Sequence, residues 1–116
     1  QVTAPRIAHV ELIGAANGEP SAAVRARVLA ARQRQRARQG ALNSALPAAE
    51  LLRYCTLGAE QRRLLDSAGE RLGLSARALH RLLRVARTLA DLEDSDAVAT
   101  RHLTEAIGYR MALAGG

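Results

Sequence analysis

The sequence predicts an all-α protein, a compact bundle of four to five helices. Alanine (25), leucine (18) and arginine (17) fill 60 of the 116 positions, and all three residue types are strong helix formers. Phe and Trp are absent and only six Val and three Ile occur, whereas strands favour β-branched and aromatic side chains. A chain of this length suffices for one small domain with a single core of leucine and alanine.

The composition also excludes several classes of protein. Lysine is absent, so the net charge of +6 rests on arginine. A P-loop needs a lysine that reaches the β- and γ-phosphates, so we expect that this chain does not cleave ATP alone. No apolar run approaches the roughly 18 residues of a membrane span, and no signal-peptide pattern is present, so no membrane partner is expected. The single cysteine, Cys55, cannot form an internal disulfide, which favours a reducing, cytoplasmic setting.

Residues 1–19 are expected to form an extended lead-in, and residues 20–39 the first helix. Proline at position 20 suits a first helical turn, and Gly40 suits a left-handed C-terminal cap. An apolar stripe at helical spacing, widened by Leu29, consists of Val24, Val28 and Ala31. Arginines flank this stripe on both sides: Arg25, Arg32 and Arg36 on one, Arg27, Arg34 and Arg38 on the other.

Two further helices are expected in the middle of the chain. Pro47 opens a short helix that ends near residue 54, with Leu51 and Leu52 facing inward. A helix over residues 58–72 is expected to end in a Schellman-type stop, because Gly73 is followed by a leucine.

The last two helices are expected over residues 76–92 and 100–110, followed by a tail over 111–116. Ser75 is the N-cap of the first of these, the longest well-patterned segment. We expect one core from the helices after residue 58, made of Leu64, Leu65, Leu79, Leu82, Leu83, Leu89, Leu103 and Ile107.

The helix over residues 76–92 carries an arginine stripe on the face opposite its leucines. With Arg77 at 0°, Arg81, Arg84 and Thr88 fall within about 40°, while the apolar side chains fall between about 120° and 240°. Arg77 lies in the first turn, where the helix dipole disfavours a cation by roughly 0.3–1 kcal/mol. This local conflict indicates a functional residue. A solvated arginine is the alternative interpretation.

Three segments together resemble the C-terminal helical domain of magnesium chelatase-like AAA+ ATPases of the ComM/YifB type. They are SAAVRARVLAAR (21–32), LGLSARALHRLLRVARTLADL (72–92) and HLTEAIGYR (102–110). The resemblance covers residues 20–110 and implies an AAA+ lid domain, which closes over ATP bound to a preceding P-loop domain. It also implies that Arg77, within Ser75-Ala76-Arg77, is the sensor 2 arginine.

The same resemblance implies a larger assembly. Residues 1–19 would run out of a P-loop domain outside this chain, and ATP with Mg²⁺ would belong to the full-length protein, which would form a homo-oligomeric, hexameric ring. DNA is an implied partner, with a porphyrin or metal-insertion substrate left open. No catalytic residue and no metal site is expected here. Arg81 and Arg84 are candidates for contact with the P-loop domain or a neighbouring subunit, with solvent exposure as the alternative.

The alternative function is a stand-alone, arginine-rich, helical nucleic-acid-binding module. A sequence pI near 11.2 and arginines gathered on one helix are typical of such proteins. Two tyrosines offer almost no platform for stacking bases, which argues against a single-strand binder. The candidate phosphate contacts are Arg25, Arg32 and Arg36.

Overall fold

The structure, a computed structural model, describes the backbone of residues 21–115 and the side chains of residues 21–111. Within this range the chain forms five α-helices and one 3-10 segment, and no strand, which confirms the all-α class. The elements are α2 (Ser21–Gln39), η1 (Asn43–Ala45), α3 (Ala48–Cys55), α4 (Ala59–Leu72), α5 (Ala76–Leu92) and α6 (Thr100–Gly115). The expected lead-in over residues 1–19 lies outside the described residues. Helix α6 extends five residues beyond its expected end at Arg110.

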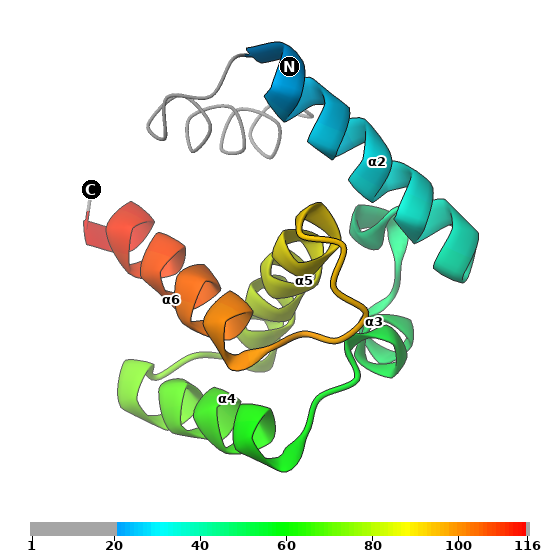
Figure 1. Ribbon diagram of the computed structural model, residues 1–116. Coiled ribbons are helices and arrows are strands. Elements are labelled where there is room, and N and C mark those ends of the chain that lie inside the picture. The colour runs from blue at the N-terminus through cyan, green and yellow to red at the C-terminus, as the bar shows by residue number, and fades with distance from the viewer. Residues whose placement is uncertain (1–20, 116) are drawn as a thin grey trace.

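Helix α5 is the centre of the arrangement. It packs against α6, α2, α3 and η1, while α4 packs against α6. Figure 1 shows α2 and α4 on opposite sides of the bundle, with α5 between them. Among the described helices, none has the length and apolar character that a membrane crossing requires. The neighbours of α5 therefore cover several of its faces.

The core forms largely as the apolar spacing predicts. Four of the eight expected residues are buried, namely Leu82, Leu83, Leu89 and Leu103. Three more are partly buried against the same cluster, namely Leu64, Leu65 and Ile107, and Leu79 packs beside Gly69. The core also takes in Leu46, Leu51, Cys55, Ala86, Ala90, Val98 and Ala106.

Two apolar residues expected to face inward do not. Leu29 on α2 is 56% exposed and Leu52 on α3 is 44% exposed. Helix α2 meets the bundle along the line of Val24 and Ala31, and the eight-residue α3 buries Leu51 but not its neighbour. In both helices the surface covered by the bundle is narrower than the apolar stripe in the sequence.

The predicted ends of α2 and α4 and the predicted start of α5 are confirmed. Gly40 and Gly73 adopt left-handed backbone angles, with φ of 76° and 63°. After α4, the amide of Gly73 bonds the carbonyl of Glu70 at 3.4 Å and that of Leu74 bonds Gly69 at 2.9 Å, as in a Schellman motif. Ser75 Oγ accepts a hydrogen bond from the amide of Ala78 at 3.1 Å and so caps α5.

Cys55 is a core residue rather than a reactive thiol. Its side chain is fully buried at the end of α3. Burial raises the pKa of the Cys55 thiol to about 11, so the nucleophilic thiolate is scarce at neutral pH. Cys55 therefore contributes to packing, as a small apolar side chain would.

Candidate functional site at the exposed end of α5 and its buried anchor

Arg77 lies exposed at the start of α5. It occupies the first turn, and no described residue forms a hydrogen bond or an ion pair with its guanidinium. The amides of Ala76 and Arg77, like the first amides of any helix, have no intrahelical acceptor. A guanidinium without a partner among the described residues and two helix-start amides therefore share the positive end of the helix dipole, a combination that suits a phosphate.

The exposed surface continues for two more turns of α5. Arg81 is exposed, also without a partner among the described residues, and Val85 is 38% exposed. These side chains, with Arg77, form an uncovered ridge on the N-terminal half of the helix. The outward direction expected for Arg77 and Arg81 is confirmed.

The outward direction expected for Arg84 and Thr88 is wrong. Arg84 Nη1 donates hydrogen bonds to the carbonyl oxygens of Asn43 and Leu46, the second at 2.8 Å. Thr88 Oγ1 accepts a hydrogen bond from Asn43 Nδ2 at 3.1 Å. The face opposite the leucines is thus covered by η1 from Arg84 onward. A helical wheel cannot show this, because η1 lies about forty residues earlier in the chain.

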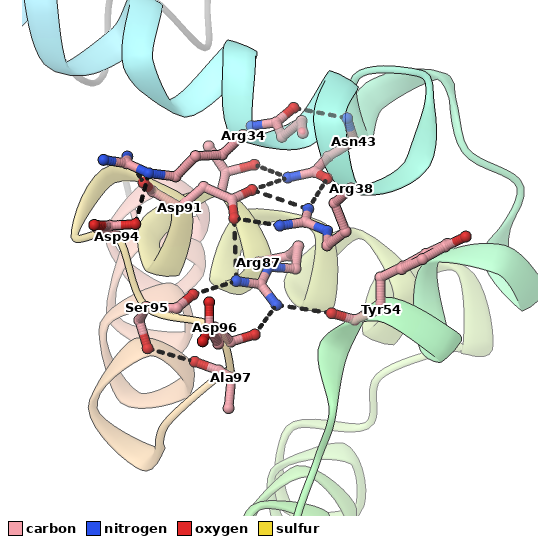
Figure 2. A network of polar contacts seen from close by, with 12 residues as sticks. Arg34, Arg38, Asn43, Tyr54, Arg87, Asp91, Asp94, Ser95, Asp96 and Ala97 are labelled. Atoms are coloured by element: carbon pink, nitrogen blue, oxygen red, sulfur yellow. Dashed lines mark hydrogen bonds and ion pairs between the residues drawn. The ribbon is translucent and has the colours of Figure 1, made fainter.

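Arg87 is the fully buried anchor of α5 (Figure 2). Its Nη1 donates to the carbonyl of Tyr54 at 2.7 Å and to that of Asp96 at 2.9 Å, and its Nη2 donates to that of Ser95 at 2.7 Å. Nη2 also lies 3.1 Å from Asp91 Oδ1. Burial lowers the pKa of the Arg87 guanidinium from its ordinary value, an effect that the Asp91 carboxylate opposes. One side chain therefore joins α5 to the end of α3 and to the loop before α6.

Two arginines of α2 bind Asp91, which lies one turn after Arg87 on α5. Arg38 Nη1 and Nη2 bind the two Asp91 carboxylate oxygens at 2.7 and 3.2 Å, a bidentate pair. Arg34 Nη1 donates to the Asp91 backbone carbonyl at 2.6 Å, and Arg34 Nε lies 2.7 Å from Asp94 Oδ1. We call Arg34, Arg38, Asp91 and Asp94 the clasp. The clasp brings cations to the negative end of the α5 dipole, where α5 has no basic residue of its own.

Asn43 completes the network from η1. Its side chain is fully buried, and its Nδ2 donates to Asp91 Oδ2 at 3.0 Å as well as to Thr88. Its Oδ1 accepts from Arg38 Nη2 at 3.1 Å and from Gln39 Nε2 at 2.8 Å. Every polar group of the Asn43 side chain is thus paired, which gives the junction of α2, η1 and α5 a single geometry.

The site predicted from the sequence did not include this buried network. Arg87 and Asp91 are four residues apart on α5, so the spacing of an i, i+4 ion pair was a usable signal. Asn43 lies in a loop and carries no comparable pattern. Its partners on α5 are 45 and 48 residues away.

His102 has a structural environment at the start of α6. Its ring is fully buried, Nδ1 accepts from the amide of Ala99 at 2.9 Å, and Nε2 therefore donates to Glu93 Oε1 at 2.8 Å. The hydrogen bond from His102, with a smaller contribution from Arg101, holds the pKa of Glu93 below its usual value. Both ring nitrogens are thereby committed to binding the α5–α6 loop to the first turn of α6.

The predicted arginine flank of α2 faces solvent in part. Arg25 and Arg36 are exposed and Arg32 is half-buried, and none of the three has a partner among the described residues. On the other flank, Arg34 and Arg38 are held in the clasp. The structure thus divides these five of the six α2 arginines into an internal pair and an outward row.

Most of the chain is similar to known proteins. The family model described as magnesium chelatase, subunit ChlI C-terminal, matches residues 18–110. The uncharacterized protein YifB of Salmonella typhimurium is 48% identical over 96 residues, which are 83% of this chain and 19% of that protein. YifB of Escherichia coli, also uncharacterized, is 48% identical over 93 residues, 80% of this chain and 18% of that protein. The competence protein ComM of Haemophilus influenzae is 45% identical over 93 residues, with the same shares.

The matched region is a small part of each relative, since the chain spans about a fifth of their length. The family model and the relatives of the expected type confirm the resemblance inferred from the three segments. The chain belongs to the magnesium chelatase subunit ChlI C-terminal family and is a C-terminal domain of the ComM/YifB type.

Proposed function

We propose that this chain is the lid domain of a magnesium chelatase-like AAA+ ATPase, and that Arg77 is its sensor 2 arginine. In this function the bundle closes over ATP that a P-loop domain, elsewhere in the full-length protein, binds with Mg²⁺. The observation that carries the proposal is the exposed Arg77, which has no partner among residues 21–111, in the first turn of a helix whose other end is internally anchored.

The chemistry at the start of α5 fits a phosphate group. A guanidinium can bridge two phosphate oxygens with paired hydrogen bonds, and the free amides of Ala76 and Arg77 add donors on the same side. A cation in the first turn costs an isolated helix roughly 0.3–1 kcal/mol, and a polyphosphate would remove that penalty. Loss of the γ-phosphate would weaken the attraction and let the lid move relative to the P-loop domain.

Arg77→Ala in the full-length protein tests this role. We expect ATP turnover to fall by about 10²-fold, because a charge-assisted contact is lost where negative charge shifts during cleavage. Arg77→Lys should recover only part of the rate, since an ammonium cannot make the planar paired contact. Steady-state ATPase rates measure both effects.

The matched control is Arg62→Ala on α4, which removes another exposed arginine without a partner among the described residues. It should retain the wild-type rate, and both variants should keep the wild-type melting temperature. Equal rates for wild type and Arg77→Ala would contradict the assignment.

A second function, contact with nucleic-acid phosphates, is supported by the charge on α2. This helix contains six arginines and no acidic residue, a charge equal to the net charge of +6 of the whole chain. The outward row of Arg25, Arg32 and Arg36 extends over roughly 16 Å along the helix. Because α2 contains no aromatic side chain, the row would contact the backbone rather than stack on bases.

The salt dependence of duplex binding by this chain tests the second function. We expect binding without sequence preference that weakens steeply with salt, since counterions are released. Replacing Arg25, Arg32 and Arg36 together with glutamine should reduce the slope of log K against log salt by about 2.7, or about 0.9 per phosphate contact. Fluorescence anisotropy with a labelled duplex measures the slope.

The control variant replaces three exposed α4 arginines with glutamine, Arg62, Arg63 and Arg71, and so has the same net charge. An identical decrease in both triple variants would show that overall charge, not the α2 row, governs binding. A salt-tolerant, sequence-selective complex would instead indicate a stand-alone DNA-binding module.

A further inference from the structure

We propose that the clasp is a positioning device, which couples the orientation of α2 to the placement of Arg77. The inference rests on the proposed lid function and names the residues through which motion of α2 would reach the nucleotide-facing end of α5. Arg38 and Asp91 are its central pair, and neither is placed against the nucleotide itself.

The contact between α2 and α5 depends on polar groups. Val24 and Ala31 are the buried apolar residues of α2, whereas Leu29 is exposed. The C-terminal half of α2 instead reaches α5 and η1 through Arg34, Arg38 and the buried Gln35, whose Oε1 accepts from the amide of Asn43 at 2.8 Å. A small apolar contact can slide, but a bidentate pair between guanidinium and carboxylate fixes both distance and angle.

Asp91 is also bound by residues outside the clasp, so Arg38 binds a carboxylate whose position is fixed. Arg87 and Asn43 bind the same carboxylate that Arg38 binds, and Asp91 is only 1% exposed (Figure 2). Movement of Arg38 must therefore either break a buried ion pair or take the end of α5 with it. Loss of one partner of a buried ion pair is strongly destabilising, so the orientation of α2 and the position of α5 stay coupled.

Helix α5 then acts as a lever between the clasp and Arg77. The two ends are 14 residues apart, a rise of about 21 Å. No glycine or proline interrupts the segment, so the helix has no point at which it would bend readily. In contrast, the first turn of α5 has the Ser75 cap and no ion pair to a described residue, so Arg77 can follow the helix axis.

The test is a double-mutant cycle on ATP hydrolysis by the full-length protein, using Arg38→Gln and Arg77→Ala. We expect Arg38→Gln alone to lower kcat by about tenfold to 10²-fold, because a misplacement near 1 Å costs this much, and to leave KM within about twofold. In the Arg77→Ala background, Arg38→Gln should change kcat by less than about twofold, since the arginine that it positions is gone. Arg38→Lys should recover only part of kcat, because lysine keeps the positive charge but cannot form the bidentate pair with Asp91.

The control is Arg63→Gln on α4, an exposed arginine outside the clasp, which should leave kcat unchanged in both backgrounds. Assays are run below the melting temperature of every variant, so that loss of fold does not enter the comparison. If Arg38→Gln and Arg77→Ala act additively, or Arg38→Gln behaves as Arg63→Gln, the coupling is overturned while the lid function stands. If Arg77→Ala itself retains full activity, the lid function fails and the coupling fails with it.

Discussion

Arg87→Ala is expected to lower the free energy of unfolding by about 3–5 kcal/mol, because removing one partner of a buried ion pair leaves an uncompensated charge. The truncation also takes the donor away from the carbonyl oxygens of Tyr54, Ser95 and Asp96. Small domains are stable by only about 5–15 kcal/mol, so a large part of the stability would be lost. Urea denaturation followed by circular dichroism measures the change.

A double replacement separates the ion pair from the carbonyl contacts of Arg87. Replacing a buried pair by apolar residues of similar volume is often neutral or stabilising. The variant Arg87→Met with Asp91→Leu should nevertheless remain destabilised, because the three carbonyl oxygens would lose their donor and Arg38 would lose its carboxylate partner. The control Arg63→Ala, at an exposed position, should stay within about 0.5 kcal/mol of wild type. Wild-type stability of the double variant would show that the carbonyl contacts contribute little.

Leu83→Ala is expected to destabilise the protein by about 2–5 kcal/mol through lost burial and the cavity left behind. Leu83 is 1% exposed and lies in the core formed by α3, α5 and α6. Helices from several parts of the chain line this site, so they cannot collapse into the cavity without disturbing one another. Thermal and urea unfolding both report the loss.

The control for Leu83→Ala is the same substitution at Leu52, which is 44% exposed. Leu52→Ala should cost about 1 kcal/mol or less, because about half of its side chain already contacts water. The pair also tests the corrected direction of Leu52, since an inward residue would behave as Leu83 does. Equal losses at the two positions would contradict the burial described here.

The caps show how much of the fold local chemistry predicts. Gly40 and Gly73 end their helices because glycine adopts a left-handed backbone without steric cost, and Ser75 starts α5 because its hydroxyl accepts from an orphan amide. These contacts join residues at most five apart, so the sequence contains all of the necessary information.

The inner face of α5 was likewise predictable, because leucines at helical spacing share one side of any helix. The same wheel placed Arg77 and Arg81 outward, and the structure agrees. It failed at Arg84 and Thr88 on the same outer face. Helical spacing states which residues share a face but not what covers that face.

The sequence by itself determined the helical class, the caps that end α2 and α4 and begin α5, the leucine face of α5 and the outward Arg77, because each depends on neighbours within a few turns. Only the tertiary structure decided which of the other arginines form internal contacts. Arg38 and Arg84 became internal through partners 53 and 41 residues away, and Asn43 became the hub of the network. Helical spacing does not show whether a charged side chain will contact water or a distant carboxylate. That outcome is set only when α2 and η1 fold over the end of α5 and replace water around Asp91.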